Sequence, residues 1–226
     1  MLLGYEIGVI EIFLIISCAS LLKHKYIQLK TLNKVVYYWL IFTVVTGLFW
    51  EPAYVFNFKE VANYSHHLIQ TQKHVWTSLY NPSYILPWKL SIIFYGEYGA
   101  WADRDYMNIN NDWSRVIEST HSIFSGLFAI IAITSIIKNN HKLFILTLGV
   151  SMGTQLMNSI LYLTEYFIQI HDNTSINYSN STFPSGILLK NRAFMWVNIL
   201  WTIMPLYTII IYLCKYKSQN HLKLDL

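Results

Sequence analysis

Five long runs of apolar residues recur along the chain, separated by more polar segments. They extend over residues 3–22, 35–56, 116–137, 143–163 and 194–213. A helix needs about 20 predominantly apolar residues to cross the hydrocarbon core of a bilayer, and each run is close to that length. We therefore predict an all-α protein, a polytopic membrane helix bundle with five transmembrane helices, in a single membrane domain over residues 1–226.

A longer and more polar segment, residues 57–115, separates the second run from the third. We expect it to form a long loop outside the spans. Part of it, residues 83–100, mixes apolar and polar positions and is interrupted by Pro87 and Lys89. That pattern fits either an amphipathic helix lying on the membrane or a lid over a pocket.

Composition agrees with a membrane protein and argues against a soluble one. The 226 residues are 54% hydrophobic and only 12% charged, whereas soluble domains average about 25% charged residues. The net charge of +4 arises from lysines that gather in three places. These are the first short loop (Lys23, Lys25, Lys30, Lys34), the third loop (Lys138, Lys142) and the C-terminal tail (Lys215, Lys217, Lys223).

The positions of these lysines predict the topology. By the positive-inside rule, lysine-rich short segments face the cytoplasm, so the lysines do not call for a nucleic-acid partner. The N-terminus and the segments 57–115 and 171–193 are then lumenal, and the C-terminus is cytoplasmic. Glycosylation sequons begin at Asn63, Asn173, Asn177 and Asn180, all within those two segments.

Carboxylates inside the apolar runs are the strongest functional signal. Glu11, Glu51, Glu118 and Glu165 all lie within a run or at its edge. An ionisable side chain at mid-depth costs at least about 2.5 kcal/mol, so it usually faces the bundle interior and has a function. For Glu165 an interfacial position is the favoured interpretation.

Depth estimates place these groups together. At about 1.5 Å per residue, Glu11 lies about 12 Å from the lumenal edge and Glu51 about 8 Å from it. Similar counting puts every polar candidate in the lumenal half: Glu11, Glu51, Glu118, His121, Asn158, Glu165, Asn198 and Trp201. The cytoplasmic halves of the last three runs carry no carboxylate or imidazole. We therefore predict one polar pocket.

Local spacing supports such a pocket. Glu118 and His121 are three residues apart and share a helix face, and Asn198 and Trp201 repeat that spacing. Pro52 directly follows Glu51, so it is expected to break the second helix and aim the carboxylate inward. Trp50 would supply an apolar wall of the pocket. A pocket with these side chains suits a flat apolar molecule.

Two groups of residues have a second possible interpretation, and it stays open for Asn158 alone. Asn158 either contributes to the pocket or only holds two helices together by a hydrogen bond. His66, His67 and His74 are close in sequence, but they lie in a polar segment without matching carboxylates. We therefore expect no metal site.

Several motifs carry a resemblance to a known family. They are Glu97-Tyr-Gly-Ala-Trp-Ala-Asp-Arg-Asp-Tyr106, followed by Glu118 at the start of an apolar helix; Leu161-Tyr-Leu-Thr-Glu165; and Asn198-Ile-Leu-Trp201 with Pro205 downstream. In order and spacing these motifs resemble the emopamil-binding protein family. The similarity covers about residues 36–213 and implies the EXPERA fold, a helix bundle around a pocket that opens into the membrane.

The resemblance also implies an activity. The family's best-known reaction is sterol Δ8–Δ7 isomerisation in the endoplasmic reticulum, a double-bond shift without redox change or cofactor. An acid protonates the ring alkene and a base removes a neighbouring proton. Glu51 and Glu118 match the family's acidic positions, and Asn198 and Trp201 match its pocket positions on the last helix. We expect Glu51, Glu118 and His121 to be catalytic and Glu11, Trp50, Asn158, Asn198 and Trp201 to bind the ligand.

One departure leaves two functions open. The sterol isomerases of this family carry a histidine four residues before the helix 2 acid, and this chain has Gly47 there. Either His121 replaces the missing imidazole and shuttles protons with Glu118, or the pocket binds a ligand without catalysis. The expected ligands are a sterol or another flat apolar lipid, or a cationic amphiphilic amine. A homodimer is left open.

Overall fold

The computed structural model describes residues 1–26, 32–107, 112–172 and 193–224. The described chain is almost entirely helical, and five helical stretches are long and apolar enough to cross a membrane. They are Gly4–Lys25, Lys34–Phe56, Trp113–Ile137, His141–Gln169 and Phe194–Tyr212. The predicted all-α membrane bundle with five spanning helices is confirmed. The segment 173–192, with the sequons at Asn173, Asn177 and Asn180, lies outside the described residues.

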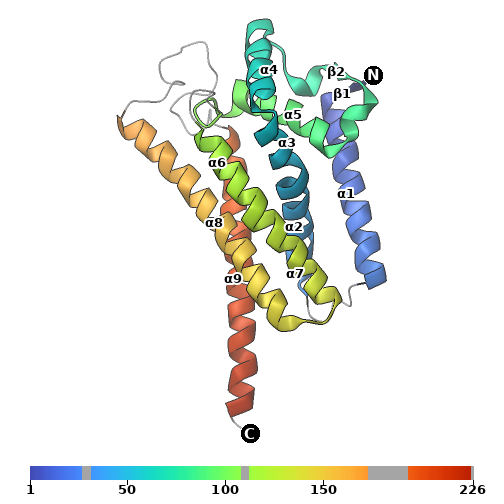
Figure 1. Ribbon diagram of the computed structural model, residues 1–226, viewed down its shortest axis with the longest axis vertical. Helices are drawn as coiled ribbons and strands as arrows, with labels where there is room; N and C mark the ends of the chain where they lie inside the picture. Colours follow the sequence, from blue (N-terminus) through green and yellow to red (C-terminus); the bar gives the residue numbers. More distant parts are fainter. Residues whose placement is uncertain (27–31, 108–111, 173–192, 225–226) are drawn as a thin grey trace.

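Three of the spans are single helices and two are composite. The single ones are α1 (Gly4–Tyr26), α8 (His141–Asp172) and α9 (Ala193–Leu224). The second span joins α2 (Lys34–Val45), the π-helical turn η1 (Thr46–Trp50) and α3 (Glu51–Phe56). The third joins α6 (Trp113–Thr120), the π-helical turn η5 (His121–Gly126) and α7 (Leu127–Ile137). Figure 1 shows these helices side by side, with the chain's C-terminal helix extending beyond the others.

The two composite spans are widened rather than broken. In η1 the N–H of Glu51 bonds the carbonyl of Thr46, five residues back. Pro52, which follows, has no N–H and its ring clashes with the carbonyl four residues earlier, so a wider turn at this point relieves both problems. The expected break at Pro52 is therefore a π turn in a continuous span, and Glu51 is buried there at 3% exposure.

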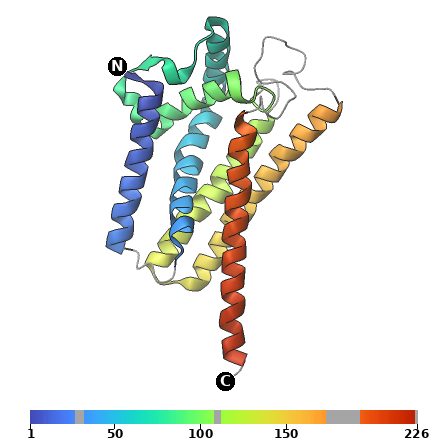
Figure 2. The same ribbon diagram turned by 180° about the vertical axis from the view of Figure 1, so that it is seen from behind.

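Most of the segment expected as a long loop is folded into a cap at one end of the bundle. It contains α4 (Phe58–Thr71), α5 (Pro87–Glu97) and the π-helical turn η4 (Tyr98–Ala102). Short elements join them: η2 (Val75–Thr77), β2 (Leu79–Tyr80) and η3 (Pro82–Ile85). Strand β1 (Leu2–Leu3) pairs antiparallel with β2, which attaches the N-terminus to the cap. Figures 1 and 2 show the cap at the end where the N-terminus lies, opposite the C-terminus.

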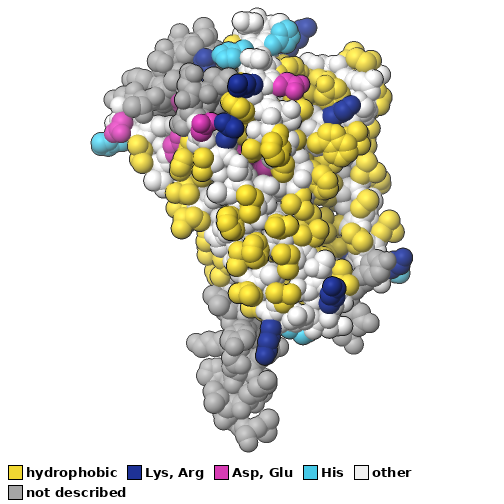
Figure 3. All heavy atoms as spheres, in the orientation of Figure 1, with side chains coloured by type: hydrophobic (Ala, Val, Ile, Leu, Met, Phe, Trp, Pro, Cys, Tyr) yellow, Lys and Arg dark blue, Asp and Glu magenta, His cyan; other side chains and the backbone are white. Residues whose placement is uncertain are grey.

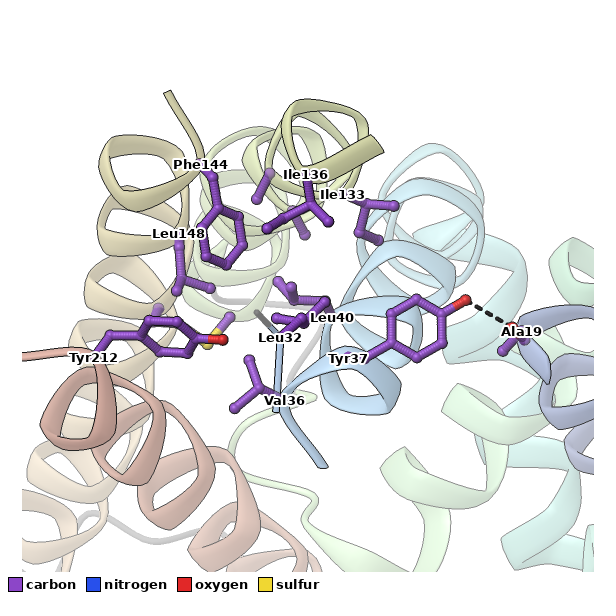
Figure 4. Close-up of a cluster of buried hydrophobic side chains, with 13 residues drawn as sticks. Ala19, Leu32, Val36, Tyr37, Leu40, Ile133, Ile136, Phe144, Leu148 and Tyr212 are labelled. Carbon is purple, nitrogen blue, oxygen red and sulfur yellow. Dashed lines mark hydrogen bonds between the residues drawn. The ribbon is translucent and has the colours of Figure 1, made fainter. Parts of the chain in front are cut away.

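The buried side chains form separate clusters at the two ends. Far from the cap, Tyr37 and Leu40 of α2 meet Phe144 of α8 in an aliphatic and aromatic cluster (Figure 4). Tyr37 also donates a hydrogen bond to the Ala19 carbonyl, 2.7 Å away, and so ties α1 to α2. Next to the cap the cluster is dominated by tyrosines: Tyr54, Tyr95, Tyr98, Tyr106, Tyr162 and Tyr166.

The surface between the two ends is apolar. Large side chains such as Phe13 of α1, Phe167 of α8 and Trp196 of α9 are more than half exposed. Hydrophobic side chains cover the middle of the face in Figure 3, whereas most charged ones lie toward the two ends. Such a surface is costly in water and is what lipid chains would cover.

Candidate functional site

The centre of the site is a buried pair between the second and third spans. Nδ1 of His121, the first residue of η5, lies 2.5 Å from Oε1 of Glu51, the first residue of α3. Both side chains are about 95% buried. A buried carboxylate is tolerated only when it is paired and hydrogen-bonded, and this imidazole provides the pairing.

Two glycines bring the helices close enough for this pair. A Cβ added at Gly47 would lie 2.7 Å from Cα of Gly126, and one at Gly126 would lie 2.9 Å from Cα of Gly47. No side chain fits between backbones that close. Gly47 therefore has a packing role: because it has no side chain, η1 can contact η5, from which His121 reaches Glu51.

Glu118, one turn before His121, is held by the cap. The hydroxyl of Tyr95 on α5 donates to Oε2 at 2.8 Å, and the hydroxyl of Tyr106 donates to Oε1 at 2.7 Å. Burial first, and then the negative charge of Glu118, raise the pKa of both phenols well above the usual value. The phenols thus stay protonated, and both oxygens of Glu118 act as acceptors.

A glutamine on α8 completes the surroundings of His121. Nε2 of Gln155 lies 3.0 Å from Nε2 of His121 and 3.3 Å from the hydroxyl of Thr43. The indole N–H of Trp39 donates to Oε1 of Gln155 at 2.7 Å. The side chains of Gln155, Thr43 and His121 are all buried, so the imidazole is hydrogen-bonded at both nitrogens.

One carboxylate oxygen of the His121–Glu51 pair is not hydrogen-bonded within the described part of the chain. Among the described residues, Oε2 of Glu51 is buried and has no hydrogen-bond partner. Leaving a buried acceptor unsatisfied costs about 1–3 kcal/mol, so such an atom is a natural contact point for a ligand or a proton. Together the arrangement can hold a proton at Glu51, supply an acceptor at Glu118 and stabilise a positive charge between them.

Glu11 and Trp50, both expected to bind ligand, contact each other. The indole N–H of Trp50 donates to Oε1 of Glu11 at 3.0 Å, and the Trp50 carbonyl accepts from Ser91 on α5 at 2.6 Å. This joins α1, η1 and α5. Oε2 of Glu11 is a second buried oxygen without a partner among the described residues.

The other three expected ligand residues have different surroundings. The amide of Asn158 donates to the Ile117 carbonyl at 3.2 Å and so holds α8 against α6, which is the simpler of its two interpretations. Trp201 of α9 packs edge-on against Trp39 at 5.4 Å between ring centroids. Asn198 is 8% exposed, and its Oδ1 has no partner in the described part of the chain.

The structure gives His121 a different partner from the expected one. Helical spacing put it on one face with Glu118, but its hydrogen bonds go to Glu51 and Gln155 on neighbouring spans. Spacing within one helix tells which side chains share a face, and says nothing about what faces them.

Five residues of the site were not proposed as site residues from the sequence: Trp39, Thr43, Tyr95, Tyr106 and Gln155. Tyr95 and Tyr106 come from the segment 57–115, and although Tyr106 ends one of the quoted motifs, no pattern indicated that either hydroxyl would bond to Glu118. Gln155 had a usable signal, because an amide in an apolar spanning helix needs a hydrogen-bond partner. Within the described residues, no group of three or more His, Cys, Asp or Glu side chains could hold a metal ion.

Fold and site together define the class: a multi-pass, all-α membrane protein with a buried acid–imidazole cluster where its spans meet a folded cap. No family model, no curated protein and no solved structure matches the chain. Arguments about function therefore rest on the chemistry of the site and on the sequence motifs.

Proposed function

We propose that this protein is an intramembrane isomerase that shifts a double bond in a flat apolar lipid, as a sterol Δ8–Δ7 isomerase does. The observation that carries the proposal is the buried His121–Glu51 pair with an unpartnered carboxylate oxygen, one helical turn from Glu118. The motif resemblance to the emopamil-binding protein family supports it independently. From the same resemblance we expect the protein to reside in the endoplasmic reticulum membrane.

The chemistry follows from the positions of the two acids. Glu51, backed by His121, gives a proton to one carbon of the alkene, and a carbocation forms on its neighbour. Glu118 then removes a proton from the next carbon, which restores a double bond one position along. One proton enters the ligand and one leaves it, so no oxidant or cofactor is needed. The carboxylates and the tyrosine rings near Glu118 stabilise the cation.

A second candidate function is binding without catalysis, and a specific observation favours it. Both oxygens of Glu118 already accept phenol hydrogen bonds, which weakens Glu118 as a base. Three buried carboxylates, at Glu11, Glu51 and Glu118, also outnumber the single buried imidazole of the described spans. Such a surplus attracts a cationic amphiphilic amine whether or not any reaction occurs.

The deciding experiment expresses the chain in a yeast strain without its own Δ8–Δ7 sterol isomerase and profiles sterols by mass spectrometry. Conversion of Δ8 to Δ7 sterols is expected, and its loss in Glu51→Gln, Glu118→Gln and His121→Ala. Glu60→Gln and His66→Ala, at exposed positions of α4, are matched controls that should keep activity.

The alternative outcome is equally informative. If Δ8 sterols accumulate despite membrane expression, isomerisation is refuted. Thermal stabilisation of the purified protein by a cationic amphiphilic amine, lost in Glu51→Gln but kept in Glu60→Gln, would then establish the binding function.

A further inference from the structure

The hydrogen-bond network around Gln155 determines where the proton on His121 lies. The chain of contacts begins at Trp39, whose indole nitrogen can only donate. The side-chain atom of Gln155 that it meets at 2.7 Å must therefore be the amide oxygen. The indole of Trp39 therefore fixes the orientation of the Gln155 amide.

With the oxygen facing Trp39, the amide NH₂ faces His121 and Thr43. Its two hydrogens have two acceptors: Nε2 of His121 at 3.0 Å and the hydroxyl oxygen of Thr43 at 3.3 Å. The hydroxyl of Thr43 donates its own hydrogen to the Trp39 carbonyl at 2.9 Å, so its oxygen can accept a hydrogen bond from Gln155. Every donor in this network has an acceptor only if Nε2 of His121 carries no proton.

We propose that Gln155, oriented by Trp39, is a positioning residue that fixes His121 as the neutral imidazole with its proton on Nδ1. That proton points at Oε1 of Glu51, 2.5 Å away. A neutral imidazole has one N–H and one bare nitrogen. The donor amide of Gln155 occupies the bare one, so His121 cannot take up a second proton there without breaking the network.

The consequence concerns which group is the acid of the site. With Nε2 blocked, His121 acts only through Glu51, and Oε2 of Glu51 is the atom without a partner among the described residues. Glu51 then contacts the ligand, and His121 stabilises the carboxylate that remains after proton release. This role rests on the proposed function, whereas the tautomer itself depends only on the hydrogen bonds.

The test is ¹⁵N solid-state NMR of histidine-labelled protein in lipid bilayers, where protonated and unprotonated ring nitrogens resonate far apart. The His121 signals are identified by their loss in His121→Gln. In the unaltered protein we expect a protonated Nδ1 and an unprotonated Nε2. In Gln155→Glu the new carboxylate accepts from the imidazole, so the unprotonated Nε2 signal should disappear.

Trp39→Phe keeps an aromatic side chain but removes the indole N–H that orients Gln155. The amide can then rotate, and both tautomers should appear. Gln70→Glu, on the exposed face of α4, and Trp196→Phe, on the exposed face of α9, make the same chemical changes elsewhere and should leave the His121 signals unchanged.

A proton on Nε2 in the unaltered protein would overturn the proposal, even if neither Gln155→Glu nor Trp39→Phe folds. So would a Gln155→Glu spectrum that keeps the unprotonated Nε2 signal. Because the spectra require no ligand and no turnover, they separate this proposal from the isomerase proposal, which the sterol profile tests alone.

Discussion

At the scale of single residues, the packing of two helices requires a glycine at position 47. The backbone of Gly126 lies where its Cβ would be, so any larger side chain must push η1 and η5 apart. The same contact explains why a histidine at position 47 is incompatible with this backbone. The imidazole reaches Glu51 from the facing helix instead.

Gly47→Ala should therefore destabilise the protein, by about 1–3 kcal/mol for overpacking. Gly149→Ala on α8 is the matched control, because a Cβ there meets nothing within 4 Å, and alanine favours a helix over glycine. Unfolding in mixed detergent micelles measures both variants. Equal stability of Gly47→Ala and the unaltered protein would contradict the close crossing.

The His121–Glu51 pair makes a second prediction at this scale. In His121→Leu the buried Oε1 of Glu51 loses its hydrogen-bond donor, and an unsatisfied buried acceptor costs about 1–3 kcal/mol. Adding Glu51→Gln to His121→Leu should recover part of that loss, because an uncharged amide is less costly to bury than a carboxyl group that can ionise. The same unfolding assay applies, and a double variant less stable than His121→Leu alone would count against the pairing.

At the scale of elements, the cap and the third span are joined by hydrogen bonds to one carboxylate. Tyr95 of α5 and Tyr106 beyond η4 both donate to Glu118 of α6. The cap thus does more than cover the end of the bundle: it sets how Glu118 is hydrogen-bonded. Replacing either tyrosine by phenylalanine removes a donor to a charged group and should cost about 1–3 kcal/mol.

These tyrosines also predict how stability depends on pH. Burial raises the pKa of Tyr95 and Tyr106 well above the usual value, which is about 10 in an unfolded chain. A group whose pKa is raised by folding contributes stability below its unfolded pKa and loses it as the pH rises. Stability should therefore fall above about pH 10.

The fall should be shallower in the Tyr95→Phe and Tyr106→Phe variants, because each removes one such group. Tyr5→Phe, at a position that is 51% exposed, is the control and should keep the original slope. Stability measured from pH 8 to 11 gives the answer, and slopes that are the same in all variants would exclude a contribution from these phenols.

At the scale of the whole molecule, the distribution of lysines predicts a cap on the lumenal side and the α7–α8 turn on the cytoplasmic side. Single cysteines in a Cys18→Ser, Cys214→Ser background test this. In sealed microsomes a membrane-impermeant maleimide should label Lys142→Cys, at the start of α8, at once. Gln70→Cys on α4 should react only after permeabilisation, and the reverse pattern would invert the topology.

The spans were predictable because the tendency of a helix to enter the bilayer depends on its own residues. An apolar run of about 20 residues is long and hydrophobic enough to cross the hydrocarbon core, whatever the other helices do. The expected limits agree with the observed spans to within a few residues at most ends, with the largest differences on the fourth span. Only part of the cap was anticipated: residues 83–100 were expected to form an amphipathic helix or a lid, and α5 (Pro87–Glu97) lies there. The rest of the cap was not predicted, because its helices are short and bury tyrosines through contacts with other elements.

The sequence by itself thus determined the fold class, the number of spans and the identity of the costly polar residues inside them, since each depends on the local balance of apolar and ionisable side chains. Only the tertiary structure decided that His121 meets Glu51, that Glu118 is held by Tyr95 and Tyr106, and that Gln155 faces the imidazole. Those partners lie 12 to 70 residues apart in sequence. Which of them meet depends on how the helices pack, and here a contact between two glycine backbones sets that distance.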